Sequence, residues 1–429
     1  MNAARDFLKT YWGHTRFRPG QEKIIRSVIS GKDTLAVIAT GGGKSICYQI
    51  PALLADGLTV VVSPLLSLMK DQADDLNARG IPAASWSGAP GNRERAEIRT
   101  GLCDGSIRLL FVSPERCTMP DFAEMLGTLP VRLIAIDEAH CISEWGHDFR
   151  PEYRRLSFLK KKFPKVPVIA LTASAAPEVR RDIREQLGLV SPKEFIGSFD
   201  RKNLSYRVVP GKNPRIRLLN ALVRHRDEPG IIYCGSRKET EELAADLRKR
   251  GYDAEAYHAG LPRRVRDTVQ DRFLGGGLTI VCATIAFGMG INKPDVRYVI
   301  HMTLPKSPEA YYQETGRAGR DGRPAECILF YSPSDAARIR GLLSAGIPHE
   351  RRLRAAREKL DAMIGFCETR SCRRRYLLSY FGEEYPKESC GSCDTCESRE
   401  KTDGSSTGLM SFTGTYSSGA RPRYLPVRS

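Results

Sequence analysis

The chain of 429 residues is long enough for about two to three domains, each with its own hydrophobic core. Its 41% hydrophobic and 27% charged residues are typical of a globular protein. No stretch approaches the roughly 20 apolar residues of a membrane span, and Met1–Asp6 lacks the apolar segment of a secretory signal. The net charge of +17 favours a polyanionic partner, with nucleic acid ahead of an acidic protein or a membrane surface. We therefore expect a cytoplasmic, soluble protein.

Short runs rich in Val, Ile and Leu alternate with helix-length amphipathic segments. Such runs are typical of parallel strands that are buried on both faces. The first series of predicted strands comprises Thr34–Ala39, Thr59–Ser63, Arg108–Ser113, Leu133–Asp137 and Val168–Thr172. The second series follows the turn-rich Gly211–Pro214 and comprises Gly230–Cys234, Asp253–His258, Leu278–Ala283, Val296–His301 and Ala325–Tyr331. The pattern predicts two successive doubly wound α/β domains, at residues 1–205 and 206–335.

The last quarter of the chain differs in composition. Residues 336–381 have helical periodicity with Arg-rich faces, and five of the twelve cysteines lie within residues 367–396. This pattern predicts a small helical, cysteine-rich module at residues 336–396. From Glu397 onward Ser, Gly, Thr and Pro dominate, so residues 397–429 are predicted to be a disordered, low-complexity tail.

A glycine-rich segment follows the first predicted strand and precedes a helix-compatible run. It consists of Thr40, Gly41, Gly42, Gly43, Lys44 and Ser45. The glycines let backbone N–H groups approach phosphates, Lys44 supplies a cation to the β- and γ-phosphates, and the Ser45 hydroxyl can ligate Mg²⁺. We therefore interpret the segment as the P-loop of an ATP site rather than a plain turn.

Two adjacent carboxylates end the predicted strand Leu133–Asp137. Asp137 and Glu138 open the sequence Asp-Glu-Ala-His, the DEAH box. We expect Asp137 to hold Mg²⁺ and Glu138 to orient and deprotonate the attacking water, because phosphoryl transfer depends on positioning and charge. A solvated helix start, the usual setting of an Asp-Glu pair, is the weaker interpretation at the end of a buried strand.

The second domain carries Arg317 and Arg320 on one predicted helix face, downstream of Gln313. An arginine delivered across a domain interface stabilises charge on a transferring phosphoryl group. Because this domain has no P-loop of its own, we expect one nucleotide between the two domains. Lys44, Asp137, Glu138, Arg317 and Arg320 are thus the predicted catalytic residues.

These motifs resemble those of superfamily 2 helicases, and most closely the RecQ family. Further matching segments stand in the same order: Ser63–Gln72, Ser113–Arg116, Leu171–Ser174, Tyr233–Arg237 and Ala283–Asn292. The resemblance covers about Tyr11 to Cys396. It implies two RecA-like domains followed by a zinc-binding module, and ATP-dependent DNA unwinding with 3′ to 5′ movement, in repair and recombination.

The resemblance also assigns residues around the base and the DNA. Phe17–Gln21 looks like the adenine-recognition motif, in which Gln21 would read the adenine edge and Arg18 would lie against the base. Residues 141–153 resemble the aromatic-rich loop of the family. The residues of this loop that would contact DNA are Trp145, His147, Phe149 and Arg150. An exposed aromatic ring could stack on an unpaired base for about 1–3 kcal/mol, whereas the alternative is that Trp145 and Phe149 are core residues.

Three cysteines stand at consecutive C-x-x-C steps, namely Cys390, Cys393 and Cys396. This spacing is typical of a structural zinc site. The fourth ligand must come from upstream, and the resemblance to the RecQ zinc module favours Cys372 over Cys367.

RecQ enzymes often continue into winged-helix and HRDC domains, and we expect neither in this chain. The expected partners are single-stranded and forked or partly duplex DNA, with single-strand-binding or repair proteins and no membrane. We expect the protein in the bacterial nucleoid or the eukaryotic nucleus. Three other functions stay open: a translocase or strand-annealing factor that uses the same ATPase, an RNA remodelling helicase, and a non-catalytic zinc-bearing DNA-binding protein.

Overall fold

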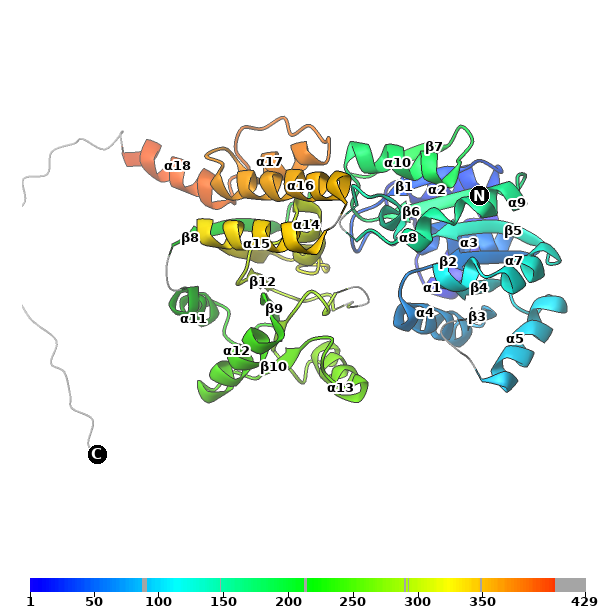
Figure 1. Cartoon of the computed structure of the whole chain (residues 1–429), viewed down its shortest axis with the longest axis horizontal. Helices are drawn as coiled ribbons and strands as arrows, with labels where there is room; N and C mark the ends of the chain where they lie inside the picture. The colour runs from blue at the N-terminus through cyan, green and yellow to red at the C-terminus, as the bar shows by residue number, and fades with distance from the viewer. Residues whose placement is uncertain are drawn as a thin grey trace, which may run out of the picture.

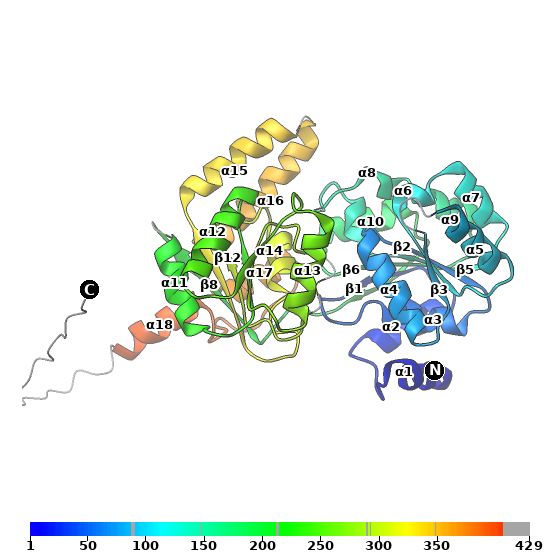
Figure 2. The same ribbon diagram turned by 90° about the horizontal axis from the view of Figure 1, so that it is seen from below.

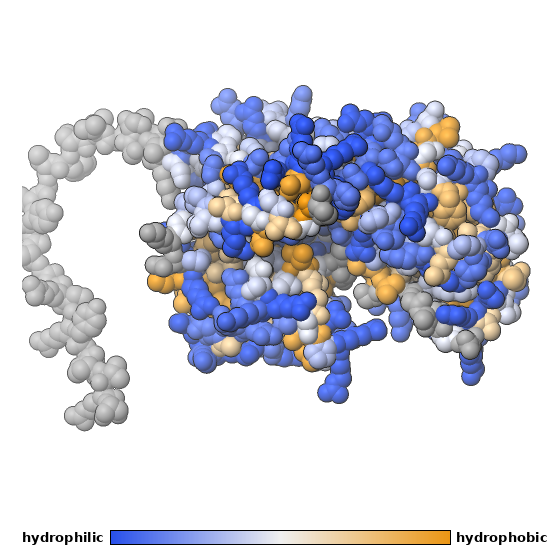
Figure 3. Space-filling model, in the orientation of Figure 1, coloured by the Kyte–Doolittle hydropathy of each residue, from blue (hydrophilic) through white to orange (hydrophobic). Residues whose placement is uncertain are grey.

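The computed structural model describes residues 1–86, 91–146, 148–211, 214–288, 291, 293–347 and 349–405. Two lobes lie side by side, and the helices of the C-terminal module run over the second lobe toward the first (Figure 1). The surface seen in this orientation is mainly hydrophilic (Figure 3). No helix in the described part of the chain is long and apolar enough to cross a membrane.

The first lobe is built on a parallel sheet of seven strands in the order β3-β4-β2-β5-β6-β1-β7. Its strands are β1 (Thr34–Val37), β2 (Leu58–Val62), β3 (Ala83–Trp86), β4 (Leu109–Val112), β5 (Val131–Ile136), β6 (Val168–Thr172) and β7 (Lys193–Ile196). Its helices are α1 (Asn2–Trp12), α2 (Gln21–Ile29), α3 (Ile46–Leu54), α4 (Leu66–Ala78), α5 (Asn92–Cys103), α6 (Pro114–Cys117), α7 (Pro120–Gly127), the 3₁₀ turn η1 (Ala139–Ile142), α8 (Pro151–Arg154), α9 (Ser157–Lys162) and α10 (Pro177–Leu187).

The second lobe has a parallel sheet of six strands in the order β10-β11-β9-β12-β13-β8. Its strands are β8 (Leu204–Pro210), β9 (Gly230–Tyr233), β10 (Ala254–Tyr257), β11 (Ile280–Ala283), β12 (Tyr298–His301) and β13 (Ala325–Tyr331). Its helices are α11 (Pro214–Arg224), α12 (Arg237–Lys249), α13 (Arg263–Leu274) and α14 (Pro308–Thr315). The predicted boundary after residue 205 falls inside β8.

Both faces of each sheet are covered, as the apolar strand sequences predict. In β2, Val60 and Val62 belong to one apolar core and Val61 to the core on the opposite face, and all three are at most 1% exposed. Burying each such side chain contributes about 1.5–3 kcal/mol. All ten predicted strands are present, while β3, β7 and β8 were not predicted.

The C-terminal module consists of four helices. They are α15 (Pro333–Gly346), α16 (Glu350–Glu368), α17 (Arg373–Tyr380) and α18 (Asp394–Ser405). Seen from below, α15 and α16 project as a pair from the second lobe (Figure 2). The prediction of a disordered tail from residue 397 is wrong for residues 397–405, which continue α18, while residues 406–429 lie outside the described part. Glu397 anchors this helix because both of its carboxylate oxygens accept hydrogen bonds from Arg207 of β8, at 2.8 and 2.7 Å.

Candidate functional site

A cavity of about 480 Å³ lies between the two lobes. The first lobe contributes the P-loop, the DEAH carboxylates and part of α4, and the second lobe contributes residues in and after α14. The lining residues that the sequence predicted are Thr40, Gly41, Gly43, Lys44, Ser45, Asp137, Glu138, Gln313, Arg317 and Arg320. Predicted catalytic residues that stand up to 276 positions apart in the sequence, from Lys44 to Arg320, thus share one cavity.

The P-loop turns sharply between β1 and α3. Gly41 and Gly43 have φ values of 80° and 78°, a backbone region that disfavours other residues. A Cβ atom on Gly43 would lie 2.6 Å from Nε2 of Gln21. That amide donates to the carbonyl oxygens of Gly42 and Gly43, at 3.2 and 2.9 Å, and the Arg18 guanidinium donates to the Gly41 carbonyl. In this structure Arg18 and Gln21 therefore hold the P-loop itself.

The two DEAH carboxylates lie at the end of β5, facing Lys44. Glu138 adopts the left-handed conformation with φ 46°, which is uncommon for a residue with a side chain, and its carboxylate lies 3.7 Å from Nζ of Lys44. Burial, reinforced by the neighbouring charge of Glu138, raises the pKa of Asp137 to about 6. A cation bound here would favour the ionised form of Asp137.

A chain of polar contacts leads from Glu138 to the second lobe. Its carboxylate lies 3.3 Å from Nδ1 of His140, which is 2.9 Å from Oγ1 of Thr172. That hydroxyl oxygen accepts a hydrogen bond from the backbone N–H of Ser174 at 3.3 Å. The Ser174 hydroxyl in turn accepts from Nε2 of Gln313 on α14, at 3.5 Å. Glu138 is thus linked to the helix that precedes the arginines.

Arg317 and Arg320 enter the cavity from the end of α14. The Arg317 side chain is buried and donates to the Gly288 carbonyl, while Nη1 of Arg320 donates to the Ile291 carbonyl at 2.6 Å. Burial, together with the positive charges of Arg317 and Arg201, lowers the pKa of Arg320 to about 9. A bound anion would relieve this repulsion.

The sequence analysis missed Arg201, which belongs to no motif. Its Nη2 atom donates to the carbonyl oxygens of Ala318 and Gly319, at 2.8 and 3.0 Å. Its Nη1 atom donates to the carbonyls of Thr40 and Gly316, at 3.5 and 3.3 Å. Arg201 thus connects the P-loop with the segment that bears the arginines. Trp12, another cavity residue, was also missed.

The aromatic-rich loop, residues 141–153, follows the DEAH box. Trp145 packs partly buried against the main apolar core. The guanidinium groups of Arg154 and Arg352 both lie over the ring of Phe149, at 5.4 and 4.5 Å from its centre. Arg150 donates to the Pro64 carbonyl at 3.0 Å and pairs with Asp148. The predicted DNA contact His147 lies outside the described residues.

The structure brings together the four thiols that the sequence selected. The Sγ atoms of Cys372, Cys390, Cys393 and Cys396 all lie within 4.8 Å of one another. Cys367 is buried in α16 within the apolar core and is not part of this group. Four convergent thiols are the donor set of a tetrahedral structural zinc site.

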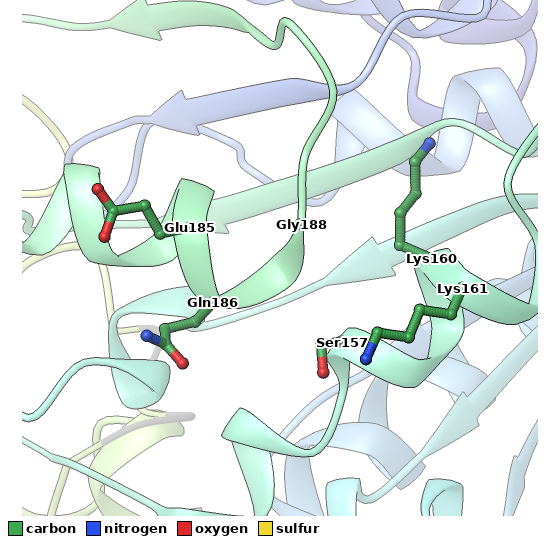
Figure 4. A pocket seen from close by; sticks show the side chains of 6 residues that line it. All are labelled: Ser157, Lys160, Lys161, Glu185, Gln186 and Gly188. Atoms are coloured by element: carbon green, nitrogen blue, oxygen red, sulfur yellow. The ribbon is translucent and has the colours of Figure 1, made fainter.

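A second cavity, of about 370 Å³, lies between α9 and α10 of the first lobe and contains none of the predicted site residues (Figure 4). The amine of Lys160 is directed away from this cavity and pairs with the buried Asp33 at 2.8 Å. We assign this cavity no function.

Three family models match the chain. They are DEAD/DEAH box helicase at residues 18–183, Helicase conserved C-terminal domain at residues 214–322, and RecQ zinc-binding at residues 333–397. Among similar proteins, the ATP-dependent DNA helicase RecQ of Bacillus subtilis (strain 168) is 44% identical over 399 residues, which cover 92% of this chain and 67% of the relative. The chain belongs to the RecQ family of ATP-dependent DNA helicases.

RecQ proteins of two further bacteria are similar to this chain in sequence. ATP-dependent DNA helicase RecQ of Pasteurella multocida (strain Pm70) is 48% identical over 92% of this chain. The chain spans 62% of the length of that relative and 63% of the Haemophilus influenzae RecQ.

Solved structures show the same fold at low identity. The Mycobacterium smegmatis helicase Lhr, bound to ssDNA and AMP-PNP, aligns with a TM-score of 0.59 and 20% identity, covering 85% of this chain and 57% of that chain. The S. cerevisiae Dbp5, bound to RNA and ADP BeF3, aligns with a TM-score of 0.61 and 16% identity, covering 82% and 91%. Two parallel-sheet RecA-like domains with a RecQ-type zinc-binding module describe the architecture.

Proposed function

We propose that this chain hydrolyses ATP in response to single-stranded DNA, moves along it from 3′ to 5′ and unwinds duplex DNA. The observation that carries this proposal is the cavity between the lobes, because a P-loop and a DEAH pair on one wall face two arginines on the other. A site divided in this way links hydrolysis to the opening and closing of the lobes.

Each predicted catalytic residue has a role that its position supports. Lys44 neutralises the β- and γ-phosphates, and Glu138 orients the attacking water and accepts its proton. Arg317 and Arg320 stabilise the charge of the transferring phosphoryl group. Glu138 lies 3.7 Å from Nζ of Lys44, so the carboxylate assigned to the water stands beside the cation assigned to the phosphates.

The residues that we assign to nucleotide binding include several that are not catalytic. We assign Thr40, Gly41, Gly42 and Gly43 to the phosphates, and Arg18, Gln21 and Gln313 to nucleotide recognition and closure. The contacts of Arg18 and Gln21 with P-loop carbonyls support a role in which base binding alters the loop.

Magnesium fits the first lobe, because the Ser45 hydroxyl and the Asp137 carboxylate are hard oxygen donors. When bound, Mg²⁺ neutralises charge on the phosphate oxygens and orients them. The raised pKa of the buried Asp137 indicates a carboxylate that gains from a nearby cation.

Zinc fits the four-thiol group of Cys372, Cys390, Cys393 and Cys396. A site of four thiolates leaves no open coordination position, so its role is structural. The group joins the start of α17 to the start of α18, and the metal would stabilise this junction.

The DNA contacts are assigned to Trp145, His147, Phe149 and Arg150 of the aromatic-rich loop. The loop begins within η1, and η1 directly follows Glu138. A base stacked on Phe149 would therefore be connected to the catalytic carboxylate through the loop itself. We propose single-stranded, forked and partly duplex DNA as substrates, single-strand-binding or repair proteins as partners, and repair and recombination in the nucleoid or nucleus as the setting.

Unwinding of short duplexes with either a 3′ or a 5′ single-stranded tail tests the proposal. We expect ATP-dependent release of a strand from the 3′-tailed duplex alone, and no release by Lys44→Ala. Stimulated hydrolysis without a released strand would contradict the helicase assignment in favour of a translocase or strand-annealing factor. Stronger stimulation by RNA than by DNA would favour an RNA remodelling enzyme. Full ATP turnover by Lys44→Ala would show that the turnover does not come from this P-loop, and would favour a non-catalytic DNA-binding role for the chain.

A further inference from the structure

Helix α16 of the C-terminal module holds the aromatic-rich loop at two points. Nζ of Lys359 donates to the Gly146 carbonyl at 2.6 Å, and the Arg352 guanidinium covers the ring of Phe149 at 4.5 Å. The two side chains are seven residues apart on the helix, which places them on the same face. The loop is therefore docked on the module in this structure.

Gly146 lies tightly against the DEAH segment. A Cβ atom at this position would lie 2.2 Å from the His140 carbonyl oxygen and 2.8 Å from that of Ser143. The peptide whose carbonyl accepts the hydrogen bond from Lys359 is closely packed, so it cannot move far without moving the turn that follows Glu138. Lys359 thus contacts a residue that packs directly against the segment following Glu138, although Lys359 itself belongs to the C-terminal module.

Lys359 also faces the helix that leads to the arginines. Its Nζ atom lies 4.0 Å from Oε1 of Glu309, whose side chain is 2% exposed and stands in the first turn of α14. No hydrogen bond of good geometry reaches either oxygen of this carboxylate within the described part of the chain. The Tyr380 hydroxyl is nonetheless a polar neighbour, because burial and the Glu309 carboxylate raise the pKa of Tyr380. A buried carboxylate with so few partners is costly, so a small approach by the ammonium group would change its energy strongly. Gln313, one turn further along α14, reaches Ser174 of the first lobe.

One ammonium group is thus shared between two acceptors that belong to the two halves of the ATPase. With the loop docked, Lys359 is held at Gly146 and is 4.0 Å from Glu309. If the loop were displaced, the amine would lose its carbonyl and Glu309 would become its main partner. These are two states with different contacts, which is the physical requirement for coupling between sites.

We propose that Lys359 is a positioning residue through which α16 transmits the state of the aromatic-rich loop to α14, and that Arg352 competes with DNA bases for the face of Phe149. The proposal rests on the DNA-stimulated ATPase proposed above. The alternative is that Lys359 only neutralises the charge of Glu309.

The first test compares Lys359→Met and Lys359→Arg with the matched control Arg354→Met, whose exposed side chain pairs with Glu358 on the same helix. The readouts are the ATP hydrolysis rate without DNA and at saturating single-stranded DNA, together with the melting temperature. We expect Lys359→Met to keep the rate without DNA and to lower the stimulated rate about 10-fold, within the usual range of coupling between sites. Lys359→Arg should recover most of the stimulation, and Arg354→Met should behave as wild type.

The double variant Glu309→Gln with Lys359→Met separates coupling from charge neutralisation. It removes the unpaired buried carboxylate, so the melting temperature should return toward that of the wild type while the stimulated rate stays low. Full recovery of stimulation in the double variant would overturn the proposal. An equal loss of the basal and stimulated rates in Lys359→Met, or no loss in either, would overturn it as well.

A second pair of variants tests the contact at Phe149 without touching the buried lysine. Arg352→Gln and its exposed neighbour Arg351→Gln remove the same charge, but only the first removes the nearer of the two cations over the ring. We expect Arg352→Gln to reach half-maximal stimulation at an about threefold lower DNA concentration than Arg351→Gln, as loss of a surface cation–π contact implies. If both variants reached half-maximal stimulation at the same DNA concentration, the proposed competition between Arg352 and DNA bases would be contradicted. A wild-type protein that DNA does not stimulate at all would instead contradict the proposed function.

Discussion

Arg201 joins the P-loop to the segment that carries Arg317 and Arg320. Its guanidinium donates to the carbonyl oxygen of Thr40 in the first lobe and to those of Gly316, Ala318 and Gly319 in the second. Hydrogen bonds from a charged donor contribute about 1.5–3 kcal/mol each, so one lost contact that forms in the transition state corresponds to about a 10- to 100-fold lower rate.

We expect Arg201→Ala to lower DNA-stimulated ATP hydrolysis by at least about 10-fold on this basis. Arg26→Ala is a suitable control, because Arg26 is exposed and pairs with Glu22 of the same helix. Steady-state hydrolysis rates and the melting temperature of each variant provide the measurement. An unchanged rate in Arg201→Ala would show that the bridge between the lobes is dispensable.

Sequence motifs predicted those site residues that lie in short local patterns, such as a glycine-rich loop or a carboxylate pair after a strand. Lys44 and Asp137 follow buried strands in recognisable surroundings, so their convergence could be expected. Arg201 stands in a connecting segment without a motif, and its role depends on the position of a second domain. Arg150 was predicted to contact DNA, and in this structure it donates to the Pro64 carbonyl.

At the scale of secondary structure, an ionic network fastens β8 and α11 to β13. Glu326 of β13 pairs with Arg207 at 2.6 Å and with His225 at 2.7 Å. Burial alone would raise the pKa of Glu326, but hydrogen bonds from His225 and Arg224 and the charge of Arg207 outweigh it and lower the pKa to about 2. A folded-state pKa below the unfolded value means that this carboxylate stabilises the fold above about pH 4.5 and loses that effect as the pH falls toward 2.

We expect Glu326→Gln to lower the free energy of unfolding by about 3 kcal/mol at pH 6, from the size of the pKa shift. The same linkage lowers the wild-type contribution by about 0.8 kcal/mol between pH 6 and pH 4, so the penalty of the substitution should shrink by that amount. Burial lowers the pKa of His225, but the hydrogen bonds that its ring donates to the carboxylates of Glu326 and Glu228 outweigh burial and raise it, so His225 stabilises at low pH and loses this effect as the pH rises through its folded pKa. Urea unfolding at both pH values checks the prediction, and a penalty that does not change with pH would contradict it.

The cysteine group gives a second prediction about elements. Cys372 precedes α17, and Cys393 and Cys396 lie at the start of α18. Removing one thiol should release zinc and loosen both helices, because the metal contributes to folding. We expect metal analysis to find about one zinc per chain in the wild type and in Cys367→Ser, and much less in Cys372→Ser. Retained zinc in Cys372→Ser and its loss in Cys367→Ser would contradict the ligand assignment.

The strands that sequence analysis missed share an edge position or a weak apolar signal. β7 reads Lys-Glu-Phe-Ile and lies at the edge of its sheet, where charged residues are tolerated. β3, at the other edge of the first sheet, begins with small residues. β8, at an edge of the second sheet, alternates polar with apolar residues. The central strands are buried on both faces, so their apolar runs were easily found. α18 was missed because its sequence has no apolar periodicity, and contacts with β8 supply the stability that its own residues lack.

At the scale of the whole molecule, the C-terminal module contacts the segment that joins the two lobes. Arg374 of α17 donates to the carbonyl oxygens of Arg201 and Leu204, at 2.7 and 2.6 Å, and pairs with Asp200 at 2.5 Å. Phe381 stacks on Phe199 of the same segment, with ring centres 4.6 Å apart. The module is therefore placed to influence how the lobes close. No local pattern in the sequence predicts such contacts, because they arise from residues far apart in the chain.

The central claim is that one ATPase site is assembled from both lobes and responds to DNA. ATP hydrolysis by Arg320→Ala, with and without single-stranded DNA, tests it most directly, because Arg320 lies in the lobe without a P-loop. An arginine of this kind contributes about 10³- to 10⁵-fold to the rate, so we predict a stimulated rate at least about 100-fold below that of the wild type, with ATP binding retained. A stimulated rate equal to that of the wild type would contradict the account, because the first lobe alone would then suffice.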